Sequence, residues 1–173
     1  MTAVSLTRPG RDGVAHDPFR AAMSHHAKGV AVITAGTDDP VGFCATSLAS
    51  VSLEPPLVSF TVGLRSASWA TIATARHVMV HLLADSQADL ASLFARRDAA
   101  KFGPATRWHR NERGLPVLDD VLAWLELAVT SRTEAGDHAL VIGQVIASRH
   151  AAAGTARPLV HLGGEFVALA GAG

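Results

Sequence analysis

The sequence predicts a mostly β fold, an antiparallel barrel with short helical additions, on three observations. Eight segments show the β-branched or alternating apolar pattern of strands. Few of the connections between them have the βαβ spacing that a crossover between parallel strands needs. The length of 173 residues suits one domain. The predicted strands are residues 30–35, 41–47, 57–62, 78–83, 121–133, 138–148, 159–162 and 165–169.

The N-terminal region predicts a leader followed by a helix. Residues 1–16 hold a proline, two glycines and several charges but no apolar stretch, which indicates a flexible leader and argues against a signal peptide. Asp17 is a suitable helix cap, and Pro18 favours the first helical position. The helix is expected to end at Gly29. We therefore expect one folded domain over residues 17–173.

The centre of the chain contains two further helical signals and one long polar segment. A short helix is predicted over residues 66–75. Ser86 and Asp89 form a plausible capping pair for a second helix that ends near Phe94. Residues 96–118 are polar and irregular, so we expect a long surface loop. Loops of this length inside a domain often bind ligands.

The C-terminal third predicts a long hairpin. The β-rich runs 121–133 and 138–148 are joined by a short segment that contains Gly136 and Asp137, residues typical of a tight hairpin turn. The last two strands are joined by Gly163-Gly164. These connections again favour antiparallel pairing.

Composition excludes several classes of function. Acidic and basic side chains are equal in number, fifteen each, and form no basic block, which argues against a nucleic-acid or membrane surface. No run approaches the ~20 apolar residues of a membrane span. Cys44 is the one cysteine, and its apolar neighbours favour a buried, inert thiol over a nucleophile. The histidines are scattered, so no metal site is expected. We expect a cytoplasmic protein.

Two polar clusters are candidate binding segments. In residues 42–56, hydroxyl groups stand at strand ends, where they can hydrogen-bond the polar edge of a heteroaromatic ring or a phosphate. The alternative is a barrel corner whose hydroxyls satisfy local backbone groups. Arg65, Ser66 and Ser68 lie at the start of a predicted helix, a pattern typical of phosphate binding but also of an ordinary helix cap with a solvated arginine.

A third cluster is Gly136-Asp137-His138, at the predicted hairpin. His138 at a strand mouth can donate a hydrogen bond to the amide or phosphate of a ligand, or it can decorate an exposed turn. The chain has no GxGxxG after a strand, no phosphate loop and no HExxH motif. Any nucleotide is therefore expected to bind outside a doubly wound sheet. A Ser-His-Asp relay stays open, although no GxSxG elbow supports it.

These clusters occur together in a known family. The chain resembles the flavin reductase-like, FMN-binding split-barrel proteins, the reductase components of two-component flavin-dependent monooxygenases. The resemblance spans about residues 18–170. It depends on Met23 with residues 29–34, residues 42–58, Arg65-Ser66, residues 80–83, Lys101-Phe102, residues 123–126, Gly136-Asp137-His138 and residues 142–145.

The resemblance implies a homodimeric, six-stranded Greek-key barrel that holds flavin in a groove near the dimer interface. By resemblance, His138 meets the nicotinamide of NADH or NADPH. The residues implied to contact FMN, or FAD, are Ala45, Thr46, Ser47, Leu48, Ser52, Pro55, Arg65, Ser66, Ser68, His81, Lys101 and Phe102. Thr46 and His81 stand where many relatives carry asparagine, which leaves the choice between FMN and FAD open.

The implied reaction is hydride transfer from the nicotinamide to the flavin, after which the reduced flavin passes to a partner monooxygenase. The cofactor carries this chemistry, so the protein needs to supply orientation and no acid–base pair. One alternative is a flavin-binding or electron-storage protein of the same fold without NAD(P)H turnover. Another is a split barrel like the pyridoxamine-phosphate oxidases or the haem-binding proteins.

Overall fold

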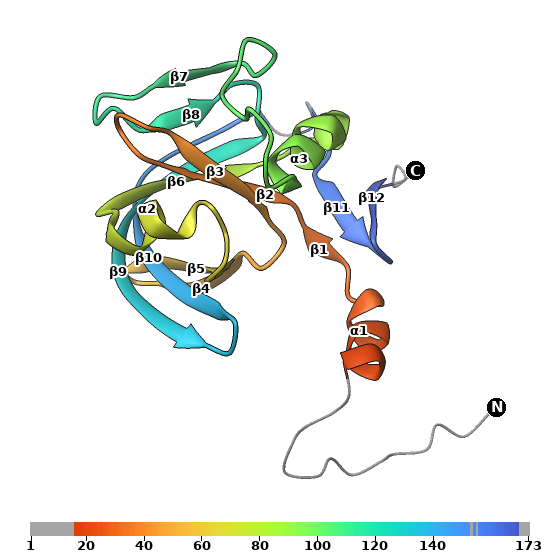
Figure 1. Cartoon of the computed structure of the whole chain (residues 1–173). Coiled ribbons are helices and arrows are strands. Elements are labelled where there is room, and N and C mark those ends of the chain that lie inside the picture. The colour runs from red at the N-terminus through yellow and green to blue at the C-terminus, as the bar shows by residue number, and fades with distance from the viewer. Residues whose placement is uncertain (1–15, 153, 155, 170–173) are drawn as a thin grey trace, which may run out of the picture.

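Seven antiparallel strands form the main sheet of the computed structural model, which describes residues 16–152, 154 and 156–169 (Figure 1). The expected leader, residues 1–16, lies outside the described residues except for His16. In spatial order the strands are β3 (Val41–Ala45), β2 (Ala31–Ala35), β6 (His77–Leu82), β9 (Ala123–Ala135), β10 (His138–His150), β5 (Pro56–Gly63) and β4 (Ala49–Leu53).

The sheet curls into a barrel because its two edge strands are consecutive in the chain. Residues 46–48 alone join β3 to β4, so the two edges lie within about 14 Å of each other at this end. The Thr61 amide on β5 donates to the Ser47 hydroxyl at 2.9 Å. The rings of Phe43 on β3 and Phe60 on β5 have centroids 6.2 Å apart. β3 and β5 thus face each other without a ladder of hydrogen bonds, which leaves the barrel split.

Two smaller sheets and four helical segments flank the barrel. In Figure 1, α3 and the β7–β8 hairpin lie on one outer side, over β2, β3 and β6, whereas α1 projects beside β1. The small sheets are β1 (Lys28–Gly29) with β11 (Leu159–Leu162) and β12 (Glu165–Ala168), and β7 (Trp108–Arg110) with β8 (Pro116–Leu118). The helices are α1 (His16–Ser24), α2 (Trp69–Thr74), the 3₁₀ turn η1 (Asp85–Gln87) and α3 (Ala88–Ala95).

Strand β2 is buried on both faces, because apolar clusters lie inside and outside the barrel. Ile33 packs inside against Phe60, Val80 and Leu127. The outer cluster, beneath α3, contains Val32, Leu83, Phe94, Leu118 and Leu159. Each fully buried side chain of this size contributes about 1.5–3 kcal/mol to stability. Val32 and Ile33 alternate between the clusters, as successive strand residues must.

The predicted mostly β, antiparallel fold is confirmed, with corrections in four segments. The N-terminal helix ends at Ser24 and not at Gly29, which lies in β1. The main sheet has seven strands where six were expected, and β4 is a strand that the sequence analysis missed. Residues 96–118 are not a plain surface loop, since they contain β7 and β8 with Leu115, Val117 and Leu118 buried. The Gln87 side chain, and not Ser86, accepts from the amide at the start of η1, that of Ala84.

The β9–β10 hairpin forms where predicted. Its turn consists of Gly136 and Asp137, and Gly136 adopts a φ of 64°, which glycine tolerates best. His138 therefore lies opposite Ala135 on β9 and opposite Gly63 on β5. This register brings the end of β5 beside the hairpin turn.

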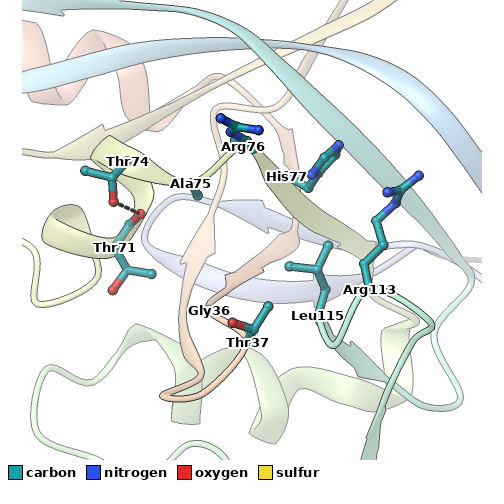
Figure 2. A pocket seen from close by; sticks show the side chains of 9 residues that line it. All are labelled: Gly36, Thr37, Thr71, Thr74, Ala75, Arg76, His77, Arg113 and Leu115. Atoms are coloured by element: carbon teal, nitrogen blue, oxygen red, sulfur yellow. Dashed lines mark hydrogen bonds between the residues drawn. The ribbon is translucent and has the colours of Figure 1, made fainter.

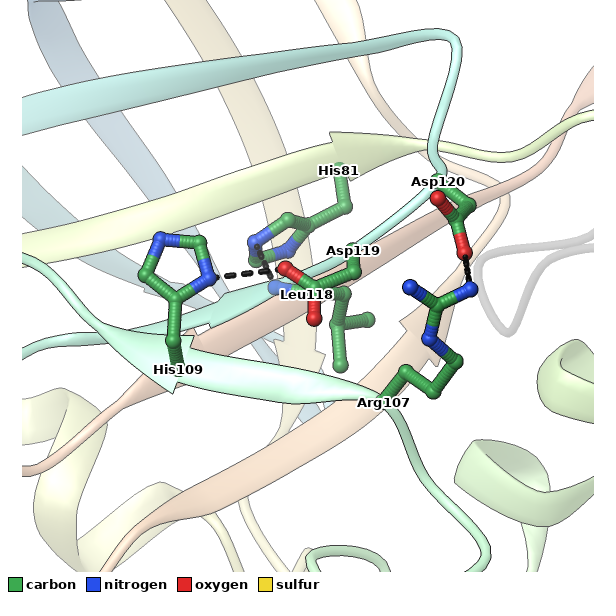
Figure 3. Close-up of polar contacts among 6 residues, drawn as sticks. All are labelled: His81, Arg107, His109, Leu118, Asp119 and Asp120. Atoms are coloured by element: carbon green, nitrogen blue, oxygen red, sulfur yellow. Dashed lines mark hydrogen bonds and ion pairs between the residues drawn. The ribbon is translucent and has the colours of Figure 1, made fainter.

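Two side-chain contacts hold the two arms of the β7–β8 hairpin together. Arg107 pairs with Asp120, and the Nδ1 atom of His109 lies 2.7 Å from an Asp119 carboxylate oxygen (Figure 3). The hairpin in turn covers the side chain of His81 on β6, since Leu118 of β8 lies directly against its ring.

His81 is a structural bridge between β2 and β8. Its side chain is 0% exposed. The Nδ1 atom lies 3.0 Å from the Val32 carbonyl oxygen, and Nε2 accepts from the Leu118 amide at 3.1 Å. The carbonyl only accepts and the amide only donates, so the ring is neutral with its proton on Nδ1. This placement corrects the expectation that His81 contacts flavin, because both ring nitrogens are engaged inside the protein.

We predict that His81 makes the protein sensitive to acid. Burial lowers the pKa of His81 from 6.5 to about 4. Between pH 6.5 and pH 4, His81 takes up a proton in the unfolded chain but not in the folded protein. The contribution of His81 to the free energy of unfolding is therefore fully present above pH 6.5 and is lost as the pH falls towards 4. The full effect is about 3 kcal/mol.

Urea unfolding at several pH values between 7 and 4 measures this loss. The matched variant is His81→Gln, whose amide keeps a donor and an acceptor but does not titrate. The wild type should lose more stability than the variant over this range, and equal losses would contradict the prediction.

Candidate functional site

Two adjoining cavities form one groove along the free edge of β3 and the ends of β5 and β10. The first cavity, about 330 Å³, lies between the β2–β3 turn and residues 97–102. The second, about 390 Å³, lies beside the β9–β10 turn. Arg97 borders both. Other lining residues are Asp39, Pro40, Val41, Gly42, Ala67, Ser68, Ala99, Ala100, Lys101 and Phe102 in the first, and Gly63, Arg65, Ser66, Asp137 and His138 in the second.

The Gly42 carbonyl organises the first cavity. It accepts hydrogen bonds from the Ser68 hydroxyl at 3.1 Å and from the Lys101 ammonium at 2.9 Å. Because β3 is an edge strand, no further strand competes for this oxygen. Glycine is required here, since a Cβ atom would lie 2.6 Å from the Phe94 ring. One strand-edge carbonyl therefore holds both α2 and the residue 97–102 segment.

Lys101 carries its charge in a partly desolvated place. Burial lowers the pKa of its ammonium, and the nearby Asp98 carboxylate partly opposes that effect. The neighbouring Phe102 ring packs edge-on against Phe94 and Trp108, with centroids 5.5 and 5.1 Å apart. The core beneath α3 thereby anchors the backbone that presents Lys101.

Arg65 and Arg97 bring two guanidinium groups to the second cavity. The Arg97 Nη2 atom donates to the Arg65 carbonyl at 3.4 Å, and both side chains are exposed. The Leu64 amide donates to the Asp137 carbonyl at 3.0 Å, which ties this turn to the β9–β10 hairpin. With Lys101, the groove has three cationic groups against the carboxylates of Asp39 and Asp137. This charge balance suits an anionic ligand.

His138 is held by the residue before it. Its Nδ1 atom lies 2.7 Å from the Asp137 carboxylate, and its Nε2 atom faces Gly63 across the strand pair. The hydrogen bond from His138, with the attraction between the two charges, lowers the pKa of Asp137. The His138 side chain is 49% exposed. An oriented and accessible imidazole can hydrogen-bond a ligand through Nε2.

The structure brings six of the thirteen expected residues into this groove. Arg65, Ser66, Ser68, Lys101, Phe102 and His138 all line it. The sequence analysis missed Arg97. The sequence signal that could have identified Arg97 is its position four residues before Lys101, within the residue 96–118 segment that was expected to bind ligands.

Residues 45–48 line neither cavity of the groove. Ala45 and Leu48 pack in the barrel core, and Thr46 is half-buried. The Ser47 hydroxyl is engaged with the Thr61 backbone. The alternative reading of this segment, a barrel corner whose hydroxyls bind local backbone, fits Ser47.

Ser52 and Pro55 lie outside the groove of their own chain. Ser52 is paired with Leu57, six residues before Gly63 along β5, which corresponds to about 20 Å. The Ser52 hydroxyl instead accepts from the Glu54 amide at 3.2 Å. A single chain thus does not bring Ser52 to the groove, and contact of Ser52 and Pro55 with flavin stays a prediction.

The described residues of the site include neither a reactive cysteine nor a cluster of metal ligands. Burial raises the pKa of the Cys44 thiol to about 11, so it stays protonated near neutral pH, as expected for an inert cysteine. Within the described part of the chain, no cluster of three or more histidine, cysteine or acidic side chains is placed to hold a metal ion.

Comparison with known proteins decides the family. The sequence model of the "Flavin reductase like domain" matches residues 23–170. The chain belongs to the flavin reductase-like family. The resemblance inferred from the sequence is thereby confirmed. In the described part of this flavin reductase-like chain, no helix is long and apolar enough to cross a membrane.

Individual relatives agree with this assignment. The chain is 41% identical over 144 residues to an NADH:FMN oxidoreductase of Rhodococcus erythropolis, covering 82% of this chain and 74% of that protein. It is 34% identical over 152 residues to the reductase subunit HsaB of a flavin-dependent monooxygenase of Mycobacterium tuberculosis, covering 87% and 81%.

A solved structure agrees as well. It is an NADH:FAD oxidoreductase of Streptomyces globisporus in complex with NAD and FAD fragments, which superposes with a TM-score of 0.82 at 31% identity. The superposition covers 88% of this chain and 91% of that one. The antiparallel fold is therefore that of the family.

Proposed function

We propose that this protein is an NADH-dependent flavin reductase that binds FMN or FAD in the groove and supplies the reduced flavin to a monooxygenase. NADPH is the alternative reductant. When bound, the flavin accepts a hydride from the nicotinamide, so the chain's own residues bind and orient the two groups. The observation that carries the proposal is the convergence of three cationic groups and an oriented, accessible histidine in one groove.

The donors in the groove fit a flavin phosphate. Arg65 and Arg97 supply guanidinium groups, which bind phosphate through paired hydrogen bonds. The Ser66 hydroxyl lies beside them, and the Lys101 ammonium lies in the adjoining cavity. The aromatic part of the flavin would then extend towards the free edge of β3, near the backbone of residues 45–48.

His138 fits the role of a positioning residue for the nicotinamide. Asp137 engages Nδ1, so Nε2 is the atom that can meet the carboxamide. Holding two reactants at a productive distance can lower a barrier by several kcal/mol, about 7 at best. No proton transfer by His138 is needed.

Moderate affinity for flavin is part of the proposed function. A reductase that passes its flavin on must release it. Two carboxylates offset part of the positive charge in the groove, and Arg65 and Arg97 are exposed to water. Screening by solvent weakens such contacts, which favours release.

We also propose a cytoplasmic homodimer built from the domain over residues 17–173. Strand β4 is an edge of the main sheet, and it exposes Val51 (49%) and Leu53 (90%). An apolar, unpaired edge invites association with a second chain. Ser52 and Pro55 lie on the same hairpin, so this interface would bring them to the partner chain.

Turnover tests the proposed reaction directly. Purified protein mixed with NADH or NADPH and an excess of FMN, FAD or riboflavin should oxidise the nucleotide. The oxidation is measured as the loss of the absorbance band of the reduced nucleotide. A protein that binds flavin and turns yellow, yet oxidises neither nucleotide, would support the storage alternative and refute the proposal.

We predict that His138→Ala raises KM for the nicotinamide nucleotide about tenfold, since one hydrogen bond is lost. The dissociation constant for flavin, measured by fluorescence quenching, should change less. His150→Ala is the matched control, because His150 is an exposed histidine at the opposite end of β10. Unchanged nucleotide kinetics in His138→Ala would remove His138 from the site.

The interface is tested with Leu53→Glu. The wild type should sediment as a dimer at micromolar concentration, and a buried charge at Leu53 should shift it to monomer. The matched control is Leu162→Glu, which places the same charge on an exposed leucine of the small sheet. A monomeric wild type, or a dimer indifferent to Leu53→Glu, would contradict the proposed interface.

A further inference from the structure

A separate cavity of about 260 Å³ lies beyond α2, and no acidic side chain lines it. Figure 2 shows its nine lining residues, with Arg76, His77 and Arg113 along one side and threonines along the rest. The complete lining is Gly36, Thr37, Thr71, Thr74, Ala75, Arg76, His77, Arg113 and Leu115. The cavity is smaller than the sites that bind drug-sized ligands, about 300–1,000 Å³. It therefore suits a small anion.

Arg113 is held in place by buried polar contacts. Its Nε atom forms an ion pair at 2.7 Å with Glu126, whose side chain is 10% exposed. The Asn111 side-chain carbonyl accepts from the amides of Arg113 and Leu115 at 3.0 and 2.9 Å, and its NH₂ group donates to Glu126. The β7–β8 turn is thus fixed. Glu126 engages the Nε edge of the guanidinium, which leaves the Nη groups for a ligand.

Arg76 differs from Arg113 because its charge is uncompensated. Its backbone is fixed, since the Arg76 carbonyl accepts from the Val129 amide at 2.9 Å. Arg132 also holds this connection from β9, donating to the carbonyls of Ile72, at 2.9 Å, and Ala75. Among the residues that the structure describes, no carboxylate pairs with the Arg76 guanidinium. A cation beside a cavity without acidic groups creates a local positive potential.

Hydroxyl groups complete the set of donors. Thr37 comes from the β2–β3 turn and Thr71 from α2, whereas the Thr74 hydroxyl already donates to the Thr71 carbonyl at 3.4 Å (Figure 2). Leu115, which is 4% exposed, closes the floor. Guanidinium, imidazole and hydroxyl donors around a small cavity match the several acceptor oxygens of phosphate. We propose that this cavity binds a phosphate-class oxyanion, either inorganic phosphate or the phosphate of a nucleotide.

The proposed site shares two walls with the groove but none of its residues. Thr37 and Asp39 belong to the same turn, yet the first lines this cavity and the second lines the groove. Ser68 and Thr71 divide in the same way at α2. Substitutions in the cavity therefore leave hydride transfer intact, and the proposal stands independently of the reaction catalysed in the groove.

Thermal unfolding with and without phosphate, at constant ionic strength, tests the proposal. Sodium phosphate at about tenfold above its dissociation constant should raise the wild-type Tm by about 4 °C. Arg76→Ala should weaken the affinity for phosphate about tenfold or more, and Arg76→Lys should retain part of that affinity. Arg76 is the position of choice, because removing Arg113 would leave Glu126 unpaired.

The matched control is Arg20→Ala, an exposed arginine on α1, which should respond to phosphate as the wild type does. NADH:flavin turnover without phosphate should be equal in all variants. A phosphate shift of equal size in wild type, Arg76→Ala and Arg20→Ala would be a general salt effect and would overturn the proposal. The proposal would also be overturned if no phosphate compound shifted the Tm of the wild type.

A second arm separates the two sources of phosphate. Adenosine 5′-monophosphate and adenosine are titrated calorimetrically into wild type and Arg76→Ala. If the ligand is a nucleotide, adenosine 5′-monophosphate should bind the wild type more tightly than inorganic phosphate does and should lose affinity in Arg76→Ala. The affinity for adenosine should be the same in both proteins. An inorganic source predicts Arg76-dependent binding of phosphate and no Arg76-dependent binding of either nucleoside compound.

Discussion

The incomplete closure of the barrel between β3 and β5 is the constraint on which the rest of the structure depends. The three-residue link between the sheet edges brings β3 and β5 together without pairing them. The outer edge of β3 therefore keeps unpaired backbone groups, and one of them, the Gly42 carbonyl, holds Ser68 and Lys101. A fully paired barrel would have used this oxygen in its own ladder. The ligand groove is thus a direct result of how the sheet closes.

Two histidines on this scaffold show how environment decides the role of a side chain. His81 lies between β2 and β8, where desolvation keeps it neutral and both nitrogens serve the fold. His138 lies at a strand end, where Asp137 engages one nitrogen and water reaches much of the ring. The first contributes stability, and the second has the accessibility that binding requires. Residue type alone does not distinguish them.

The sequence predicted the elements whose pattern is strong, such as the long β9–β10 hairpin with its Gly-Asp turn. It missed β4, although Ala49, Val51 and Leu53 alternate there with serines, because the strand is largely exposed and its hydroxyl groups favoured a binding segment. It missed β7 and β8 because strands of three residues are too short to show a period. His81, Ser52 and Pro55 were assigned to the site by resemblance to the family alone. A resemblance does not reveal that the β7–β8 hairpin covers the His81 ring, or that Ser52 lies about six residues along β5 from Gly63.

Helix α2 is attached at both ends, by Ser68 to the edge of β3 and by Arg132 of β9 to its last carbonyls. A helix of two turns that is held at both ends cannot tilt to accommodate a larger ligand. The opposite wall, residues 97–102, contacts the strand edge through the Lys101 side chain and is anchored to the core beneath α3 by the Phe102 ring. A flavin that enters the groove, as proposed, would therefore meet two walls held by different contacts, hydrogen bonds on one side and largely aromatic packing on the other.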